Sequence, residues 1–247
     1  MYNEALQLKS FVLEKEFIFD LEDNNNRLNV EDRKQILNNH CKQNDISLRP
    51  EELPNFSSTA GSIMYPLLCK FFCSESKYQA LGKEFFENPS ICIHEQMDYL
   101  QGHKRIQYAS LVLCMLCQNK MTESMITEEN SRFMAIKKKV FQNCRVSGWN
   151  TEIIDALDNM IDTFTIRTND TYSLIHDSVY EVLASHYGNK HQEDLLKYMS
   201  SSFIANKFII NDISDDIGDI HIRIHKKHFR AFAQRIVRDL KSLELHD

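Results

Sequence analysis

The sequence predicts a mainly helical protein that contains one short β-hairpin. Apolar residues recur at helical spacing along most of the chain, and the spacing changes to alternate residues only between Thr163 and Ile175. All four prolines lie within the first ninety residues. We therefore expect a helical module over 1–90, a domain of three helices and a hairpin over 91–190, and a helical tail over 191–247.

The composition is that of a globular protein. Of 247 residues, 43% are hydrophobic and 26% are charged, which is too apolar for a disordered chain. The formal net charge of -6 and the isoelectric point near 5.9 argue against general electrostatic binding to nucleic acid or anionic lipid, because both need an excess of Lys and Arg. We expect neither a nucleic-acid nor a membrane partner.

The sequence has no segment typical of a secreted or membrane-spanning protein. The longest apolar run, Tyr108 to Cys117, is half of the about 20 residues that a membrane-spanning helix needs, so it predicts a buried helix. The first residues carry acids where a secretory signal carries a basic end. The seven cysteines are odd in number and lie mostly in apolar helical runs. We expect a cytoplasmic protein with reduced thiols.

The glycines exclude a nucleotide-binding loop of the usual kind. A phosphate-binding loop needs closely spaced glycines, as in G-x-x-x-x-G-K or G-x-G-x-x-G. No two glycines of this sequence have that spacing; they are Gly61, Gly82, Gly102, Gly148, Gly188 and Gly218. The chain by itself therefore lacks the means to bind a triphosphate tightly.

Residues 1–90 predict a small helical module. The stretch "LNVEDRKQILNNHCKQN" places apolar residues on one helical stripe: Leu28, Val30, Ile36 and Leu37. The stretch "EELPNFSSTAGS" is typical of a loop and precedes the apolar "IMYPLLCKFFC".

Residues 91–190 predict a winged-helix domain. Two helices, over 104–118 and 128–143, are joined by the polar "NKMTESMIT", and a third begins at Asn150 or Thr151 and runs to about Ile161. Strands over 163–168 and 171–175 flank Asn169-Asp170, and both of these residues tolerate positive φ. Three helices followed by such a two-stranded wing are typical of a winged helix.

The tail predicts a helix over 193–208, an acidic break at "NDISDDIGD", and a final amphipathic helix. The apolar face of that final helix predicts that it docks on a surface of this chain or of another. The face consists of Ile224, Phe229, Phe232, Ile236, Leu240 and Leu243.

The third helix of the predicted winged helix argues against DNA binding. Its inward stripe is Ile153, Ile154, Leu157, Met160 and Ile161. Its opposite face carries four carboxylates, which phosphates would repel: Glu152, Asp155, Asp158 and Asp162.

Other chemical groups give weak signals. In "HIRIHKKH", His221, His225 and His228 would share one helical face, but a solvated basic face explains them better than a metal site. The pairs Cys114/Cys117 and Cys69/Cys73 lie in apolar helices and are expected in the core. No catalytic set has local support, so we expect no catalytic residue, no metal ligand and no enzyme activity of the chain by itself.

The stretch "SLIHDSVYE" is the most informative one. His176 follows the second wing strand directly, and a helix begins there with Asp177 or Ser178 as its cap and Glu181 closing a capping box. Taken alone, this position favours a structural, hydrogen-bonded histidine.

Several blocks in order carry a family resemblance. They are "YPLLCKFF", "KYQALGKEFFENP", "IQYASLVLCMLCQNKM", "FQNCRV", and "YSLIHDSVYEVLASHYG" followed by "YMSSSFIANKF". Together they resemble the region downstream of the nucleotide-binding core in the novel STAND NTPases expanded in molluscs and other invertebrates. STAND proteins, which include NACHT receptors, are signalling switches that ADP holds closed and that ATP exchange opens for assembly.

The resemblance implies roles for two residues. His176 of the His176-Asp177 pair would lie near the β-phosphate of ADP, and Pro66 in the lid would pack near the base, although Met64 stands where a glycine is common. ADP or ATP with Mg²⁺ would be held by an upstream nucleotide-binding core in cis, and the full protein would form a homo-oligomer on activation. Residues 1–90 would be the end of that core and the lid.

Two alternatives stay open at this point. The chain is either the lid and winged-helix portion of such a switch, expected as a fragment or a degenerate paralogue, or a helical protein interaction module in which His176 is structural.

Overall fold

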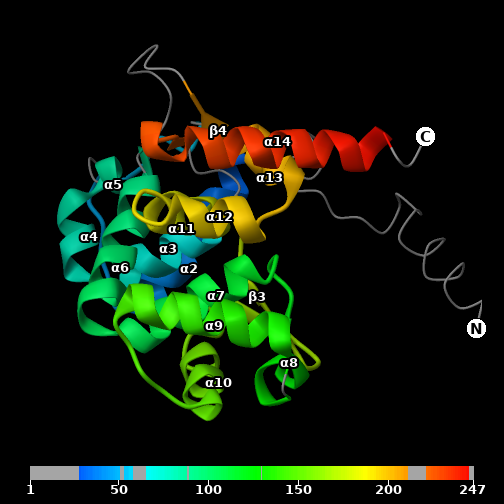
Figure 1. Ribbon diagram of the computed structural model, residues 1–247. Coiled ribbons are helices and arrows are strands. Elements are labelled where there is room, and N and C mark those ends of the chain that lie inside the picture. The colour runs from blue at the N-terminus through cyan, green and yellow to red at the C-terminus, as the bar shows by residue number, and fades with distance from the viewer. Residues whose placement is uncertain are drawn as a thin grey trace, which may run out of the picture. The chain divides into compact units, whose positions relative to one another are not determined.

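The computed structural model describes residues 28–50, 53–57, 65–87, 89–128, 130–210 and 221–244, and it is mainly helical, as predicted (Figure 1). The chain divides into two compact units, Met1–Pro89 and Ser90–Asp247. Residues 191–247, predicted as a separate tail, lie within the second unit.

The first unit contains α2 (Val30–Gln43), α3 (Tyr65–Ser74), α4 (Ser76–Leu81) and α5 (Lys83–Glu87). A capping box starts α2: the Asn29 side chain accepts the backbone N–H groups of Glu31 and Asp32, and the Asp32 carboxylate accepts the backbone N–H of Asn29. The predicted stripe of α2 is only partly right. Leu37 is buried, whereas Val30 is 40% exposed.

The buried face of α2 consists of Arg33, Leu37 and Cys41, and α2 packs against α3. The first unit also contains an aromatic cluster, in which the centroid of the Phe72 ring is 5.5 Å from that of Phe85 and 5.0 Å from that of Phe86. These large buried side chains form a central part of the core of the first unit.

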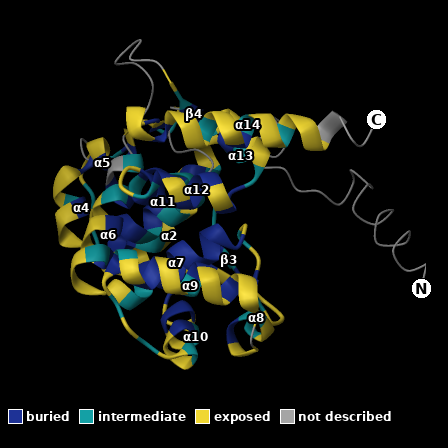
Figure 2. Cartoon of the chain, viewed as in Figure 1, coloured by how far each residue is buried: buried dark blue, intermediate teal, exposed yellow. Residues whose placement is uncertain are grey.

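The second unit is arranged around α7 (Arg105–Leu116). Every residue from Tyr108 to Leu116 is buried, and Figure 2 shows the dark ribbon of α7 inside the unit. It packs against α9 (Ser131–Cys144), α10 (Asn150–Asp158) and α11 (Asp177–Gly188), while α6 (Pro89–His103) precedes it. The three predicted helices are present, but α10 ends three residues before Ile161 because the chain turns at Asn159.

The predicted hairpin is present as β2 (Thr165–Thr168) and β3 (Thr171–Leu174), antiparallel with Thr168 opposite Thr171. Asn169 takes the positive φ of 56° that the tight turn requires. A third strand, β1 (Met121–Thr122), pairs with β3, so the sheet order is β1-β3-β2. The prediction of two strands missed β1 because it is only two residues long, in a polar segment that also forms α8 (Glu123–Thr127).

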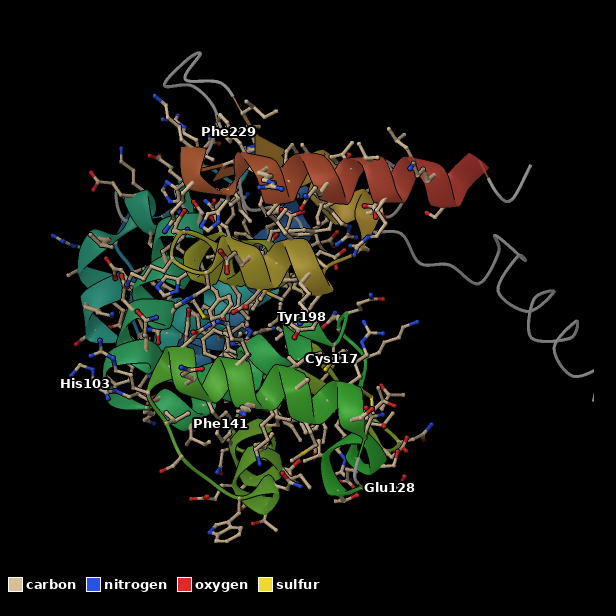
Figure 3. All side chains as sticks on the ribbon, viewed as in Figure 1. His103, Cys117, Glu128, Phe141, Tyr198 and Phe229 are labelled. Carbon is tan, nitrogen blue, oxygen red and sulfur yellow. The ribbon has the colours of Figure 1, made fainter. Side chains whose placement is uncertain are left out.

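The predicted helix over 193–208 is wrong in one respect, because it is interrupted. The structure has α12 (Gln192–Tyr198) and α13 (Ser201–Lys207), and Figure 3 labels Tyr198 at the end of α12. Met199 is extended and the Ser200 hydroxyl accepts the backbone N–H of Phe203 at 3.2 Å, so a new helix starts there. Next come β4 (Phe208–Ile209) and its parallel partner β5 (Ile222–Arg223).

The final helix, α14 (Phe229–Glu244), follows a short 3₁₀ turn, η3 (Lys226–His228), and packs against α12 (Figure 3). The prediction that it docks is confirmed, and its partner is this chain. Ile224 lies before η3 and outside the helix, contrary to the prediction. The predicted acidic break, 211–219, lies outside the described residues.

Candidate functional site

His176 lies at the junction between the hairpin and α11. The N–H of Ile175 still bonds the Phe164 carbonyl at 2.9 Å, and His176 itself is extended, with φ -157° and ψ 148°. The first helical turn follows at once, since the His176 carbonyl accepts the N–H groups of Val179 and Tyr180. The junction therefore fixes the backbone of His176 on both sides.

The imidazole of His176 caps α11. Its Nδ1 accepts the backbone N–H of Ser178 at 3.1 Å. An accepting nitrogen carries no proton, so the ring proton lies on Nε2, which is a hydrogen-bond donor. His176 is of intermediate exposure and is not among the buried residues of the core.

The predicted cap of α11 is therefore wrong. Asp177 is not the cap but the exposed first residue of the helix. Its carboxylate there interacts favourably with the helix dipole. Glu181 forms an ion pair with Lys207, at 2.7 Å, instead of closing a capping box. The prediction failed because an imidazole is not among the usual capping side chains, although its unprotonated nitrogen accepts an N–H as an Asn oxygen does.

Pro66 is the second residue of α3 and is exposed. A proline in the first helical turn loses no hydrogen bond, because the N–H groups there have no partner within the helix. The structure thus gives Pro66 a role in starting α3, and its contact with a nucleotide base stays a prediction. Met64 lies outside the described residues. Pro66 belongs to the first unit and His176 to the second.

A cluster of polar side chains connects the hairpin to the neighbouring helices by hydrogen bonds. Arg167 on β2 donates to the carboxylates of Glu123 and Asp158, and Asp158 also accepts the Tyr172 hydroxyl at 2.7 Å. Burial, reinforced by Asp158, raises the pKa of Tyr172 above its ordinary value, so the phenol stays a donor. The cluster joins β2 and β3 to α8 and α10.

All four acidic residues predicted on the third helix are exposed, but only Glu152, Asp155 and Asp158 lie on α10, because the helix ends before Asp162. Of these, Asp158 is partly neutralised by Arg167, and Glu152 accepts the backbone N–H of Trp149 at 2.6 Å at the helix start. The exposed face of α10 is therefore negatively charged and lies next to the polar cluster that joins the hairpin to α8 and α10.

The histidines of "HIRIHKKH" do not share a helical face, contrary to the prediction. His221 precedes β5, His225 follows it, and His228 lies in η3. No group of three or more potential ligands among the described residues could hold a metal ion.

All seven cysteines lie in the described part of the chain and are buried, as predicted, and none of them forms a disulfide. Burial raises the pKa of Cys117 to about 11 and that of Cys73 to about 12, so both stay protonated thiols at neutral pH. In the first unit the sulfur atoms of Cys41 and Cys73 are 3.8 Å apart.

Sequence reasoning missed a polar cavity in the second unit. Three lysines and two histidines contribute to it from α9, from the turn after α11, from the start of α12 and from η3. No spacing in the sequence connects these segments, so only the fold brings them together.

Comparison of the chain with family models, curated proteins and solved structures finds no match. Within the described part of the chain, no helix has the length and apolar character that crossing a membrane requires.

Proposed function

We propose that this chain is the regulatory portion, a helical lid followed by a winged-helix domain, of a STAND-type nucleotide-dependent signalling switch. In this proposal an upstream core in cis holds ADP or ATP with Mg²⁺ in a cytoplasmic protein. His176 contacts the β-phosphate of ADP in the closed state, and Pro66 packs near the base. Loss of these contacts opens the protein for homo-oligomerisation.

The order of elements in the second unit supports a winged helix. Helices α7, α9 and α10 precede the β2–β3 hairpin, and β1 adds a short third strand to it. His176 and Asp177 follow the hairpin immediately, as the resemblance requires.

The observation that carries the proposal is the state of the His176 ring. Because Nδ1 is bonded to Ser178, the ring orientation is fixed and Nε2 carries the proton. An N–H donor of this kind can bond a phosphate oxygen without first becoming a cation. Such a charge-assisted bond contributes about 1.5–3 kcal/mol. If made in one state only, it shifts a closed–open equilibrium by roughly ten- to a hundredfold.

The upstream sequence is the first test. A complete transcript should encode G-x-x-x-x-G-K-[ST] and an acidic Walker B strand upstream of this chain. A complete transcript without them would refute the switch and favour the interaction module.

The second test separates capping from phosphate binding at His176. His176→Ala removes both, so we expect the chain to lose about 0.5–2 kcal/mol of stability. His176→Asn keeps a capping oxygen and should restore most of that stability. In the protein that includes the upstream core, both variants should release ADP roughly ten- to a hundredfold faster than the wild type.

The Asn variant is the matched control, because it keeps a side-chain oxygen that can cap α11 and removes the Nε2 donor. ADP release from His176→Asn at the wild-type rate, measured by displacement of a fluorescent ADP analogue, would show that His176 is only a helix cap.

One observation favours the interaction module as a second candidate. Trp149, the only tryptophan of the chain, is 79% exposed at the start of α10. Exposed tryptophans often anchor protein interfaces. Under this alternative, Trp149→Ala abolishes partner binding while His176→Asn does not affect it.

A further inference from the structure

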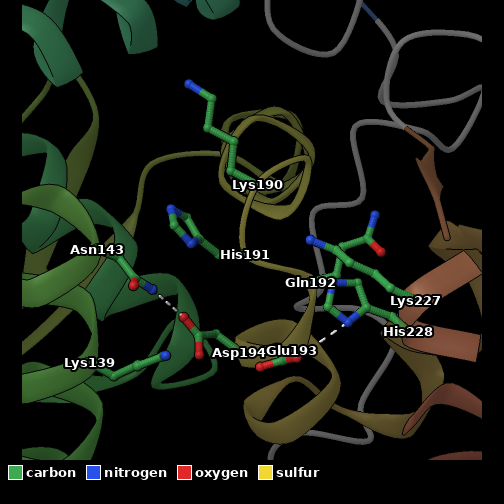
Figure 4. Close-up of a pocket in the computed structure, with 9 residues that line it drawn as sticks. All are labelled: Lys139, Asn143, Lys190, His191, Gln192, Glu193, Asp194, Lys227 and His228. Carbon is green, nitrogen blue, oxygen red and sulfur yellow. Dashed lines mark hydrogen bonds and ion pairs between the residues drawn. The ribbon is translucent and has the colours of Figure 1, made fainter. Parts of the chain in front are cut away.

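The polar cavity of the second unit has a volume of about 140 Å³ (Figure 4). Drug-sized ligands occupy pockets of roughly 300 Å³ and more. This cavity is therefore too small for a nucleotide but has room for a single small group. Its lining is polar, and three segments that are distant in the sequence contribute a lysine each: Lys139 from α9, Lys190 from the turn after α11, and Lys227 from η3.

The acidic residues of the cavity are already engaged. Asp194 is 4% exposed, and its Oδ2 accepts Asn143 Nδ2 at 2.6 Å and the Tyr187 hydroxyl at 2.7 Å. Glu193 is paired with Nδ1 of His228 at 3.4 Å, and its side chain is 68% exposed (Figure 4). The buried carboxylate thus belongs to a satisfied hydrogen-bond network, and the other is paired on the surface.

The three cavity lysines, in contrast to these acids, are not engaged by any described residue. Among the described residues, Lys139, Lys190 and Lys227 take part in no ion pair or side-chain hydrogen bond. Figure 4 shows Lys139 reaching toward Asp194 and Lys227 beside His228, whereas Lys190 extends outward. Like charges around one small cavity repel each other, and an anion between them removes that repulsion.

We propose that this cavity binds a small oxyanion of the phosphate type, either inorganic phosphate or the phosphate group of a monoester. Lys139 and Lys227 would bond its oxygens from opposite sides, and Lys190 would close the mouth. Phosphate oxygens suit ammonium donors, and such charge-assisted bonds are stronger than neutral ones. The bound anion would connect η3, and with it the start of α14, to α9. This site shares no residue with the proposed nucleotide contact and does not depend on it.

The test measures phosphate binding to the full chain. Inorganic phosphate is titrated in the low millimolar range at constant ionic strength, with sodium chloride as the balancing salt, because higher concentrations stabilise proteins non-specifically. We expect a saturable rise of the melting temperature. Equilibrium dialysis with radiolabelled phosphate gives the affinity and the stoichiometry independently of stability, with one anion bound per chain.

Matched double variants decide whether the cavity is responsible. K139Q/K227Q removes two cavity lysines and should weaken phosphate binding by tenfold or more. K138Q/K226Q removes the neighbouring lysines on the same two elements, which are exposed as Lys139 and Lys227 are but do not line the cavity, and it should bind as the wild type does. Both doubles change the net charge equally, so a difference between them reports the site.

Three results would overturn the proposal: no saturable binding by the wild type, equal weakening in both doubles, or an equal effect of chloride alone. Glycerol phosphate as a second probe distinguishes the sources. Tighter binding than inorganic phosphate identifies a monoester ligand, and tighter binding of inorganic phosphate identifies the free anion; both results support the site.

Discussion

The helices α7 and α14 are held in the second unit by opposite means. In α7, nine successive residues from Tyr108 to Leu116 are buried, so the helix is surrounded by other parts of the unit. In α14, one face is covered, while Phe229, Val237 and Leu240 are 39%, 51% and 55% exposed. The first helix is held by apolar contacts on every side, which are non-directional and add up along its length.

The second helix depends on one buried cation. Arg235 is 8% exposed, and its guanidinium donates to the Leu196 and Met199 carbonyls at the end of α12 and to the Asp239 carboxylate one turn later. The Phe232 ring adds an apolar contact, 6.1 Å from Phe208. Directional bonds therefore specify where α14 docks, and apolar burial contributes less than it does in α7.

The largest expected effect is in α7. Leu113→Ala removes a fully buried side chain and leaves a cavity that the packed neighbours cannot fill, so we expect a loss of about 2–5 kcal/mol in the free energy of unfolding. Urea denaturation followed by circular dichroism measures it. The matched control is Leu240→Ala on α14, which should change stability by no more than about 0.5 kcal/mol. Equal losses in the two variants would remove the contrast between the helices.

A smaller and local effect is expected at Arg235. Arg235→Met keeps the apolar stem but leaves two carbonyls and the Asp239 carboxylate without their donor, which costs about 1–3 kcal/mol. These hydrogen bonds connect α14 to α12 and do not involve α7. Hydrogen exchange should therefore accelerate in Phe229–Glu244 and stay slow in Tyr108–Leu116.

The control for this prediction is Arg238→Met, on the same helix but 67% exposed at its side chain, which should leave exchange unchanged. Equal acceleration in α7 and α14 of the Arg235→Met variant would show instead that the two helices unfold as one cooperative unit.

The same contrast explains which parts of the fold could be predicted from the sequence. A run that is apolar on every side, such as Tyr108 to Cys117, predicts a buried helix. The Asn169-Asp170 pair between β-branched residues predicts a tight hairpin turn. Arg235 was not predictable, because a charge on an amphipathic helix usually marks the solvated face. The break at Met199 was missed because helical spacing continues through Ser200, and only the cap reveals it.

The candidate site was predictable in position and less so in chemistry. The sequence placed His176 at the exit of the hairpin, where the structure has it, but gave the cap to its neighbours. The acceptor role of Nδ1 depends on backbone angles that no local pattern encodes. The cavity lysines gave no signal at all, since Lys139 and Lys227 come together only when η3 packs near α9.

The smallest expected effect is a pH dependence of stability that arises from His191, close to the helix on which α14 docks. His191 directly precedes α12, on which α14 docks, and its ring packs on Tyr187 at 4.7 Å. Burial lowers the pKa of His191 below the ordinary 6.5; Asp194 opposes this shift, while Lys139 and Lys190 add to it. Below pH 6.5 the unfolded chain therefore takes up a proton that the folded chain does not.

Stability should consequently fall as the pH drops from about 7 toward the folded-state pKa, and the loss should stop below that value. His191→Gln lacks the titrating group, so its free energy of unfolding should decline less over the same interval, whereas above about pH 7.5 the two proteins should differ by a constant amount. Urea denaturation at a series of pH values, in buffers without phosphate, measures both slopes. Acidification should also accelerate hydrogen exchange in α14 before α7, since α14 docks on the helix that His191 directly precedes. Identical slopes in the two proteins would show that His191 is equally protonated in the folded and unfolded chains. In that case α14 and α7 would not differ in their sensitivity to pH through His191.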